Sequence, residues 1–232
     1  MTTPRQIQAW IVSVVLLLVT WNIHAQTVEY KEGQHFFLVP AELQESEESK
    51  DEQSGATIEV LEFFSYTCPA CKQWEGFIKN WLERKAEDVV FRREHVIFSQ
   101  SSVPLARAYY LAEDLKVLPK IHDRIFEAIH RYEINLTDEE LLMQLFKNAA
   151  KVDNDTFKDK YWAQETQDRI RQGHRKVRTW QISATPTFVV GKKYVITTES
   201  AGRNPRKLFQ IVDFLADKIR AESKKAKPVE ST

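Results

Sequence analysis

The chain has 232 residues, of which 43% are hydrophobic and 11% aromatic. That is enough to build one or two domains around a real core. Its 33 basic side chains balance its 33 acidic ones, so no global field would attract nucleic acid or a membrane surface. We therefore expect a globular protein that does not bind nucleic acid.

The first 25 residues differ in composition from the rest of the chain. Arg5 is their only charged side chain, and residues 9–21 form an apolar run that has signal-peptide length but is short for a membrane span. Residues 23–25, Ile-His-Ala, make an acceptable cleavage site. We interpret residues 1–25 as a secretory signal peptide, and an uncleaved membrane anchor is the alternative.

The only two cysteines of the chain, Cys68 and Cys71, are three positions apart. An apolar run precedes them, and apolar side chains at helical spacing follow them, which predicts a strand, a short turn and a helix. Pro69 suits the first helical position, so Cys68 would be the N-cap. A thiolate there is stabilised by unpaired amides and by the helix dipole, so its pKa falls. Cys71 lies about one turn further on and can close a disulfide with it.

The cysteine pair also has simpler interpretations. A structural disulfide would close a very short loop and would remove little entropy from the denatured state. Half a zinc site would need two more ligands, and His95, His122, His130 and His174 show no paired ligand spacing. The place of the pair between strand and helix favours a redox dithiol that acts on thiols of other proteins, with no metal and no cofactor besides its own disulfide.

Strand and helix patterns follow one another through the first part of the chain. Residues 36–39 could form a short first strand, and residues 44–55 are acidic enough to form a solvated loop. Residues 56–65 and 89–98 have the composition of a buried strand and a third strand. The helix that carries the cysteines is expected to reach about Lys85.

Residues 103–179 contain four helical patterns with no clear strand between them. The first stops before Pro119, and the third opens with a capping box at Thr137. The fourth runs from about Asp155 through Ile170. This pattern predicts an all-helical block within a strand-rich frame.

The strand-rich frame resumes after the helical block. Two strand-like segments, residues 187–190 and 194–196, flank a Gly-Lys-Lys turn and predict a hairpin. Asn204 followed by Pro205 predicts the start of a last helix. The lysine-rich residues 223–232 are expected to form a flexible tail.

This order of elements resembles the DsbA family of bacterial periplasmic thiol:disulfide oxidoreductases, over roughly residues 27–222. The most specific motif is the block of residues 61–71, Leu-Glu-Phe-Phe-Ser-Tyr-Thr-Cys-Pro-Ala-Cys, with Glu75 behind it. Residues 184–192, Ala-Thr-Pro-Thr-Phe-Val-Val-Gly-Lys, resemble the cis-proline loop and hairpin of the family.

The resemblance implies an α/β, thioredoxin-like fold with an inserted all-helical domain. Residues 1–25 would then be the signal peptide, residues 26–102 and 180–222 the two parts of the thioredoxin-like domain, residues 103–179 the helical insertion, and residues 223–232 the tail.

Carried over residue by residue, the resemblance implies roles for five side chains. Cys68 would be the nucleophile and Cys71 the resolving cysteine. Glu62 falls where the family has a buried acid beneath the disulfide. Glu75 falls on a second family acid, and Arg93 lies where the family has the basic partner of that acid.

The loop before the hairpin would complete the site. Pro186 would be the cis-proline that faces the cysteines, and Thr185 would present its backbone to an extended substrate. Two positions depart from the pattern. Pro69-Ala70 stands where the best-known family dipeptide is Pro-His, and Thr185 stands where DsbA often has Val but disulfide isomerases and reductases have Thr.

The acids can also be interpreted from the residues alone. Glu62 lies inside an otherwise apolar strand, where burial is costly unless the acid is paired or functional. It could relay a proton as Cys71 ionises, or it could merely face water at a sheet edge. Glu75 and Arg93 would most simply form a structural ion pair.

The predicted enzyme passes its disulfide to exported proteins with free cysteines, in the periplasm. As the resemblance implies, a DsbB-like, quinone-linked membrane oxidase would reoxidise it. Residues 26–55 are too short for a dimerisation domain, so we expect a monomer. A disulfide isomerase or reductase, favoured by Thr185 before Pro186, and a non-enzymatic periplasmic peptide-binding chaperone are the alternatives.

Overall fold

The computed structural model describes residues 29–40 and 57–226. The expected signal peptide and the acidic loop at 44–55 lie outside these residues. Within the described residues, none of the helices combines the length and the apolar character that a membrane crossing requires.

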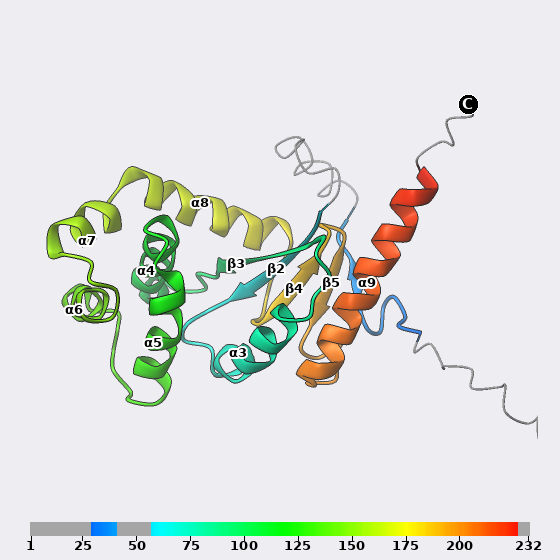
Figure 1. The fold of residues 1–232 in the computed structure, drawn as a ribbon, viewed down its shortest axis with the longest axis horizontal. Coiled ribbons are helices and arrows are strands. Elements are labelled where there is room, and N and C mark those ends of the chain that lie inside the picture. Colours follow the sequence, from blue (N-terminus) through cyan, green and yellow to red (C-terminus); the bar gives the residue numbers. More distant parts are fainter. Residues whose placement is uncertain (1–28, 41–56, 227–232) are drawn as a thin grey trace, which may run out of the picture.

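A mixed sheet of five strands forms the centre of one half of the molecule (Figure 1). Its spatial order is β1, β5, β4, β2, β3. The bounds are β1 Phe37–Leu38, β2 Ile58–Phe64, β3 Val89–His95, β4 Thr187–Val190 and β5 Tyr194–Thr197. The central strand β2 pairs in parallel with β3 and antiparallel with β4. A strand covered on both faces reads as a continuous apolar run, and all of β2 except Glu59 is buried.

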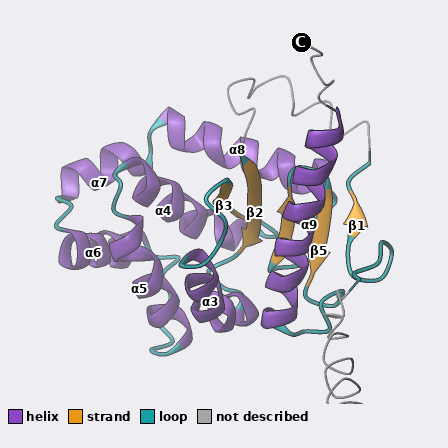
Figure 2. Cartoon of the chain, turned by 45° about the vertical axis from the view of Figure 1, so that its right-hand side comes forward, coloured by secondary structure: helices purple, strands orange, loops and turns teal. Residues whose placement is uncertain are grey.

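Two helices cover one face of the sheet, α3 (Pro69–Leu82) and α9 (Pro205–Ala226) (Figure 2). They meet where the Trp81 ring stacks on Phe209, with the ring centroids 5.1 Å apart. The Asn204 side chain accepts hydrogen bonds from two amides of the first turn of α9, which confirms the predicted cap. The helix continues to Ala226, so residues 223–226, which we expected in the flexible tail, are helical.

The helical block lies between β3 and β4 and contains five helices instead of the predicted four. They are α4 Val103–Asp114, α5 Leu118–His130, α6 Glu139–Ala150, α7 Asn154–Tyr161 and α8 Gln164–Thr179. The predicted fourth helix is interrupted at Trp162 and Ala163, where the backbone of Ala163 is extended. The Thr166 hydroxyl donates to the carbonyl of Lys160, and the Arg107 guanidinium lies 4.3 Å from the Trp162 ring centre. These contacts between distant segments hold a corner that helical periodicity does not reveal.

The N-terminus of α6 also differs from the prediction. The capping residue is Asp138, whose carboxylate accepts from the amides of Glu140 and Leu141. Thr137 instead donates its hydroxyl to Asn135. A short acidic side chain caps a helix at least as well as threonine does, so the capping box predicted at Thr137 was placed one residue too early.

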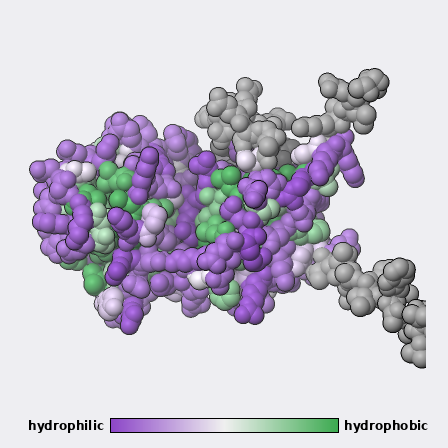
Figure 3. Space-filling view, in the orientation of Figure 1, coloured by the Kyte–Doolittle hydropathy of each residue, from purple (hydrophilic) through white to green (hydrophobic). Residues whose placement is uncertain are grey.

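The turn between β2 and α3 lies at the junction of the two halves. Phe64, Tyr66 and Cys71 are fully buried and belong to the same apolar cluster as Leu105 and Phe126 of the helical block. On the other face of the sheet, the end of α8 contributes Val177 to a separate small core. Polar and charged side chains cover most of the face seen in Figure 3. The cysteines therefore lie where the helical block packs against the sheet.

Candidate active site

Cys68 caps the N-terminus of α3, as the sequence predicts. Its backbone is extended, Pro69 occupies the first turn, and its sulfur accepts a hydrogen bond from the Cys71 amide at 3.3 Å. Both thiols are free in this structure; Cys68 is half-buried and Cys71 is buried. A substrate sulfur can therefore reach Cys68, whereas Cys71 is covered.

The pKa values of the two thiols are shifted in opposite directions. A hydrogen bond from the Cys71 side chain, helped by the side chain of Thr185 and by the Ala70 and Cys71 amides, outweighs burial and lowers the pKa of Cys68 to about 5. Burial raises the pKa of Cys71 far above its usual range, and the Cys68 hydrogen bond and the Glu62 charge add to this rise. At neutral pH, Cys68 is therefore the thiolate and Cys71 keeps its proton.

The loop before β4 faces Cys68. The Thr185–Pro186 peptide bond is cis, as expected, and the carbonyl oxygen of Thr185 lies 3.3 Å from the sulfur of Cys68, where it accepts from the protonated thiol. The Thr187 hydroxyl donates to the carbonyl of Ala184 and closes the loop. Strand β4 begins directly after the proline, a position where the missing N–H does not break the ladder.

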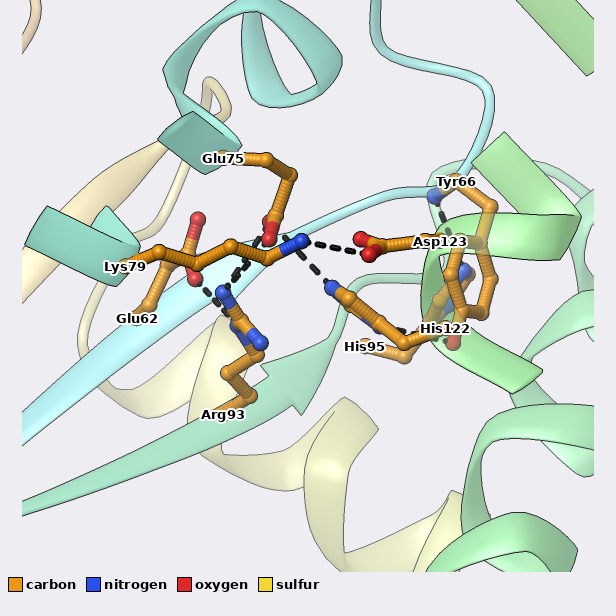
Figure 4. Close-up of polar contacts among 8 residues, drawn as sticks. All are labelled: Glu62, Tyr66, Glu75, Lys79, Arg93, His95, His122 and Asp123. Atoms are coloured by element: carbon orange, nitrogen blue, oxygen red, sulfur yellow. Dashed lines mark hydrogen bonds and ion pairs between the residues drawn. The ribbon is translucent and has the colours of Figure 1, made fainter. Parts of the chain in front are cut away.

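Glu62 and Glu75 share one cation, Arg93 (Figure 4). Glu62 and Arg93 are paired in the register of β2 and β3. The Nε of Arg93 donates to Glu62 Oε2 at 2.7 Å, and its Nη2 donates to both Glu75 oxygens, at 3.0 and 3.1 Å. The prediction that Glu75 pairs with Arg93 is confirmed, and Glu62 joins the same pair.

Glu62 has no exposed surface and lies on the central strand, so the alternative of an acid that faces water at a sheet edge is wrong. Burial, with a contribution from the Glu75 charge, outweighs Arg93 and raises the pKa of Glu62 to about 7. Burial also raises the pKa of Glu75. Two buried carboxylates that share one guanidinium therefore share a proton near neutral pH.

Three histidines surround Tyr66, two residues before Cys68, and sequence reasoning missed their role. The amide of Tyr66 donates to His95 Nε2 at 3.2 Å, and His130 Nε2 donates to its carbonyl at 2.8 Å. Its hydroxyl lies 2.9 Å from His122 Nδ1. The sequence alone presents these histidines only as candidate metal ligands, and the described residues contain no group of three His, Cys, Asp or Glu side chains that could hold a metal ion. No sequence signal connects them to Tyr66, because they come from β3 and α5.

Comparison with known proteins identifies a family that is similar to this chain. A family model described as Thioredoxin matches residues 53–205. A DsbA thiol:disulfide interchange protein of Azotobacter vinelandii is 32% identical over 164 residues, which are 71% of this chain and 76% of that protein. The DsbA of Bordetella parapertussis is 30% identical over 158 residues, 68% of this chain and 75% of the relative.

The chain belongs to the DsbA family of thiol:disulfide oxidoreductases. The crystal structure of Pseudomonas aeruginosa DsbA superimposes with a TM-score of 0.75 at 26% identity, covering 84% of this chain and 97% of that one. This likeness confirms the thioredoxin-like fold with a helical insertion. The DsbA family assignment also agrees with the geometry of the site, in which one accessible thiol of low pKa lies beside a covered thiol of high pKa.

Proposed function

We propose that this protein donates its Cys68–Cys71 disulfide to cysteine pairs of exported proteins in the periplasm. The observation that carries the proposal is the contrast between the two thiols, with Cys68 stabilised as a thiolate at a helix N-terminus and Cys71 buried as a thiol. A stabilised thiolate favours the reduced form of the enzyme, so the disulfide is readily passed on.

The reaction takes two exchange steps. A substrate thiolate attacks the Cys68 sulfur, the bond between Cys68 and Cys71 breaks, and Cys71 takes up a proton that Glu62 supplies. A second substrate thiolate then attacks the substrate sulfur of the mixed disulfide, and Cys68 leaves as the thiolate. The substrate loses two electrons and gains a disulfide, and the enzyme is left as a dithiol. The raised pKa of Glu62, about 7, suits an acid that exchanges protons at neutral pH.

The loop at Thr185 and Pro186 would hold the substrate during these steps. Its closeness to the Cys68 sulfur, 3.3 Å from the Thr185 carbonyl, supports this role. A substrate strand that pairs with the backbone of Thr185 would be recognised without a particular sequence. Pro69 and Ala70 would line the other side of the reacting sulfur.

The remaining parts of the proposal rest on the family. The protein would reach the periplasm by the signal peptide at residues 1–25, act as a monomer and need no cofactor beyond its disulfide. A quinone-linked membrane oxidase of the DsbB type would restore the disulfide by the reverse exchange, since the donation leaves two reduced cysteines that an oxidant must reoxidise.

One experiment separates the proposal from its alternatives. The oxidised enzyme is mixed with a dithiol peptide, and formation of the peptide disulfide is followed beside insulin reduction and refolding of a scrambled protein. We expect peptide oxidation to be the fastest reaction. Thr185, which contacts Cys68, is typical of disulfide isomerases and reductases. If insulin reduction or refolding of the scrambled protein is the fastest reaction instead, the protein is a reductase or an isomerase and the proposal is wrong.

Single-cysteine variants provide the control. With a substrate that already carries a disulfide, such as insulin, the Cys68 thiolate of Cys71→Ser should attack one substrate sulfur and release the other as a thiolate, and the mixed disulfide should accumulate because the resolving thiol is gone. Cys68→Ser should form none. A peptide-binding chaperone would retain its full effect in both variants, which would contradict an enzymatic role.

A further inference from the structure

A chain of polar contacts runs from the helical insertion to the acids beneath the cysteines (Figure 4). Tyr66, before α3, contacts His122 of α5. The Nε2 of His122 lies 3.2 Å from Oε1 of Glu75 on α3. Glu75 in turn shares Arg93 with Glu62. All of these side chains except the partly exposed Arg93 are buried.

The contact with Tyr66 determines which nitrogen of His122 carries the proton. The Tyr66 hydroxyl is fully buried, and among the described residues His122 Nδ1 is its one hydrogen-bond partner. An unpaired buried O–H is costly, so the hydroxyl donates its hydrogen to Nδ1. In a neutral imidazole the hydrogen then resides on Nε2, the nitrogen that lies beside Glu75.

The surroundings keep His122 neutral. Burial lowers its pKa well below the usual range, and the charge of Arg93 acts in the same direction. The remaining charged groups that face it from α3 and α5 are Lys72, Lys79 and Asp123, with Glu75 at 3.2 Å. Lys79 and Asp123 pair with each other, so their effects on the imidazole largely cancel.

The donors are unequally divided between the two acids. Both oxygens of Glu75 accept from Arg93, and the Nε2–H of His122 lies close to one of them, although it is not aligned as a full hydrogen bond. Glu62 accepts through one oxygen alone, and no described residue donates to its Oε1. Donors favour the ionised form of a carboxyl group, so Glu75 is the better-stabilised carboxylate.

We propose that His122, held by Tyr66 with its hydrogen on Nε2, is a positioning residue that keeps Glu75 ionised and thereby places the shared proton of the acid pair on Glu62. That this proton serves Cys71 rests on the function proposed above. The placement itself does not depend on that function. The helical insertion thus takes part in the chemistry of the site through α5, beyond covering it.

Loss of His122 would move the proton. Glu75 would lose the polar N–H beside its carboxylate and gain proton affinity. Protonation of Glu75 would leave Arg93 to Glu62 alone, and Arg93 would then stabilise Glu62 as a carboxylate. An ionised Glu62 has no proton to give, and its charge raises the pKa of the neighbouring Cys71 further.

Carbon-13 NMR of glutamate carboxyl groups measures this placement directly. In the reduced wild-type protein, with signals assigned by Glu62→Gln and Glu75→Gln, Glu62 should release its proton near pH 7 and Glu75 at lower pH. In His122→Leu we expect the Glu62 midpoint to fall by about one pH unit, a tenfold change in proton affinity, and the Glu75 midpoint to rise. His122→Gln, which can offer an N–H at the place of Nε2, should restore most of the difference.

Two further variants keep the test decisive. His122→Leu combined with Glu75→Gln should leave the Glu62 midpoint where Glu75→Gln alone puts it, whereas a general loosening of the site would move it. Tyr66→Phe removes the hydroxyl that holds the hydrogen of His122 on Nε2. This variant should shift the Glu62 midpoint downward by a smaller amount, so it replaces His122→Leu if that variant does not fold. Unchanged Glu62 midpoints in the folded variants would overturn the inference. Failure of peptide oxidation with shifted midpoints would instead contradict the proposed function alone.

Discussion

Cys68 and Cys71 are chemically identical residues whose positions make them act differently. The first sits at a helix N-terminus with several donors around its sulfur, and the second is buried and surrounded by groups that oppose its charge. The difference is a property of the turn, because Pro69 starts the helix and leaves Cys68 as the cap. This interpretation can be tested one side chain at a time.

The first prediction concerns the acidity of Cys68. Thiolate absorbance of the reduced protein should show a midpoint near pH 5. Because the folded-state pKa lies below the unfolded one, the thiolate stabilises the fold above the unfolded pKa, and this stabilisation is lost as pH falls through 5. At pH 7 it should be about 2 kcal/mol after allowance for solvent screening. Cys68→Ser should lack this pH dependence; a wild-type midpoint near 8.5 would show that the cap does not activate the thiol.

The second prediction concerns Glu62→Gln. The folded-state pKa of Glu62 is raised to about 7. The protonated acid therefore contributes to the stability of the fold fully below the unfolded pKa, and this contribution is lost as pH rises through 7. The variant should therefore be more stable than the wild type at pH 8, by about 1–3 kcal/mol. Turnover should slow by roughly tenfold or more, because Gln supplies no proton. Denaturation at pH 8 measures the stability, and stopped-flow exchange at about pH 6, where Glu62 holds its proton, measures the rate. Unchanged rates with lost stability would make Glu62 structural.

Single residues were predictable from sequence where one short segment carries the whole signal. Cys68, Pro69 and Cys71 lie in a contiguous strand–turn–helix pattern, so local rules sufficed. The partnership of Glu62 with Arg93 depends on the register of two strands, and the role of His122 depends on how α5 packs against the turn before α3. Neither contact can be predicted from the spacing of these residues along the chain.

At the scale of elements, helix ends show where local patterns are incomplete. The positions of β2, α3, the hairpin and α9 follow from apolar periodicity and turn residues. The corner between α7 and α8 does not, because it is held by Thr166 bonding to Lys160 and by Arg107 packing on Trp162. Apolar periodicity continues across the two-residue break between α7 and α8, so it predicted a single helix.

The third prediction tests the corrected cap of α6. Asp138→Ala should lower the free energy of unfolding by about 1 kcal/mol, because two amides of the first turn lose their acceptor. Thr137→Ala, the matched control one residue earlier, should cost clearly less. Chemical denaturation measures both, while the thiolate midpoint of Cys68 should stay unchanged in each. A larger loss in Thr137→Ala would restore the capping box at that residue.

On the scale of the whole molecule, the active site lies at the contact between the sheet-based half and the helical insertion. The insertion was predictable as a block, from the change of pattern at residues 103–179. Its participation in the site was not, since Tyr66 and Cys71 pack into the core of the helical half while Glu62 and Arg93 lie in the sheet. Which surfaces of two such halves meet is decided by packing over the whole chain.

The redox equilibrium with glutathione tests the central claim, that a stabilised Cys68 thiolate makes the disulfide oxidising. Relative to a thioredoxin-like thiol of pKa ~7, a Cys68 pKa of about 5 favours the reduced form by roughly 2–3 kcal/mol at pH 7. This corresponds to about 50 mV, so we expect a potential of about −220 mV, against about −270 mV for thioredoxin. A potential at or below that of thioredoxin would contradict the account.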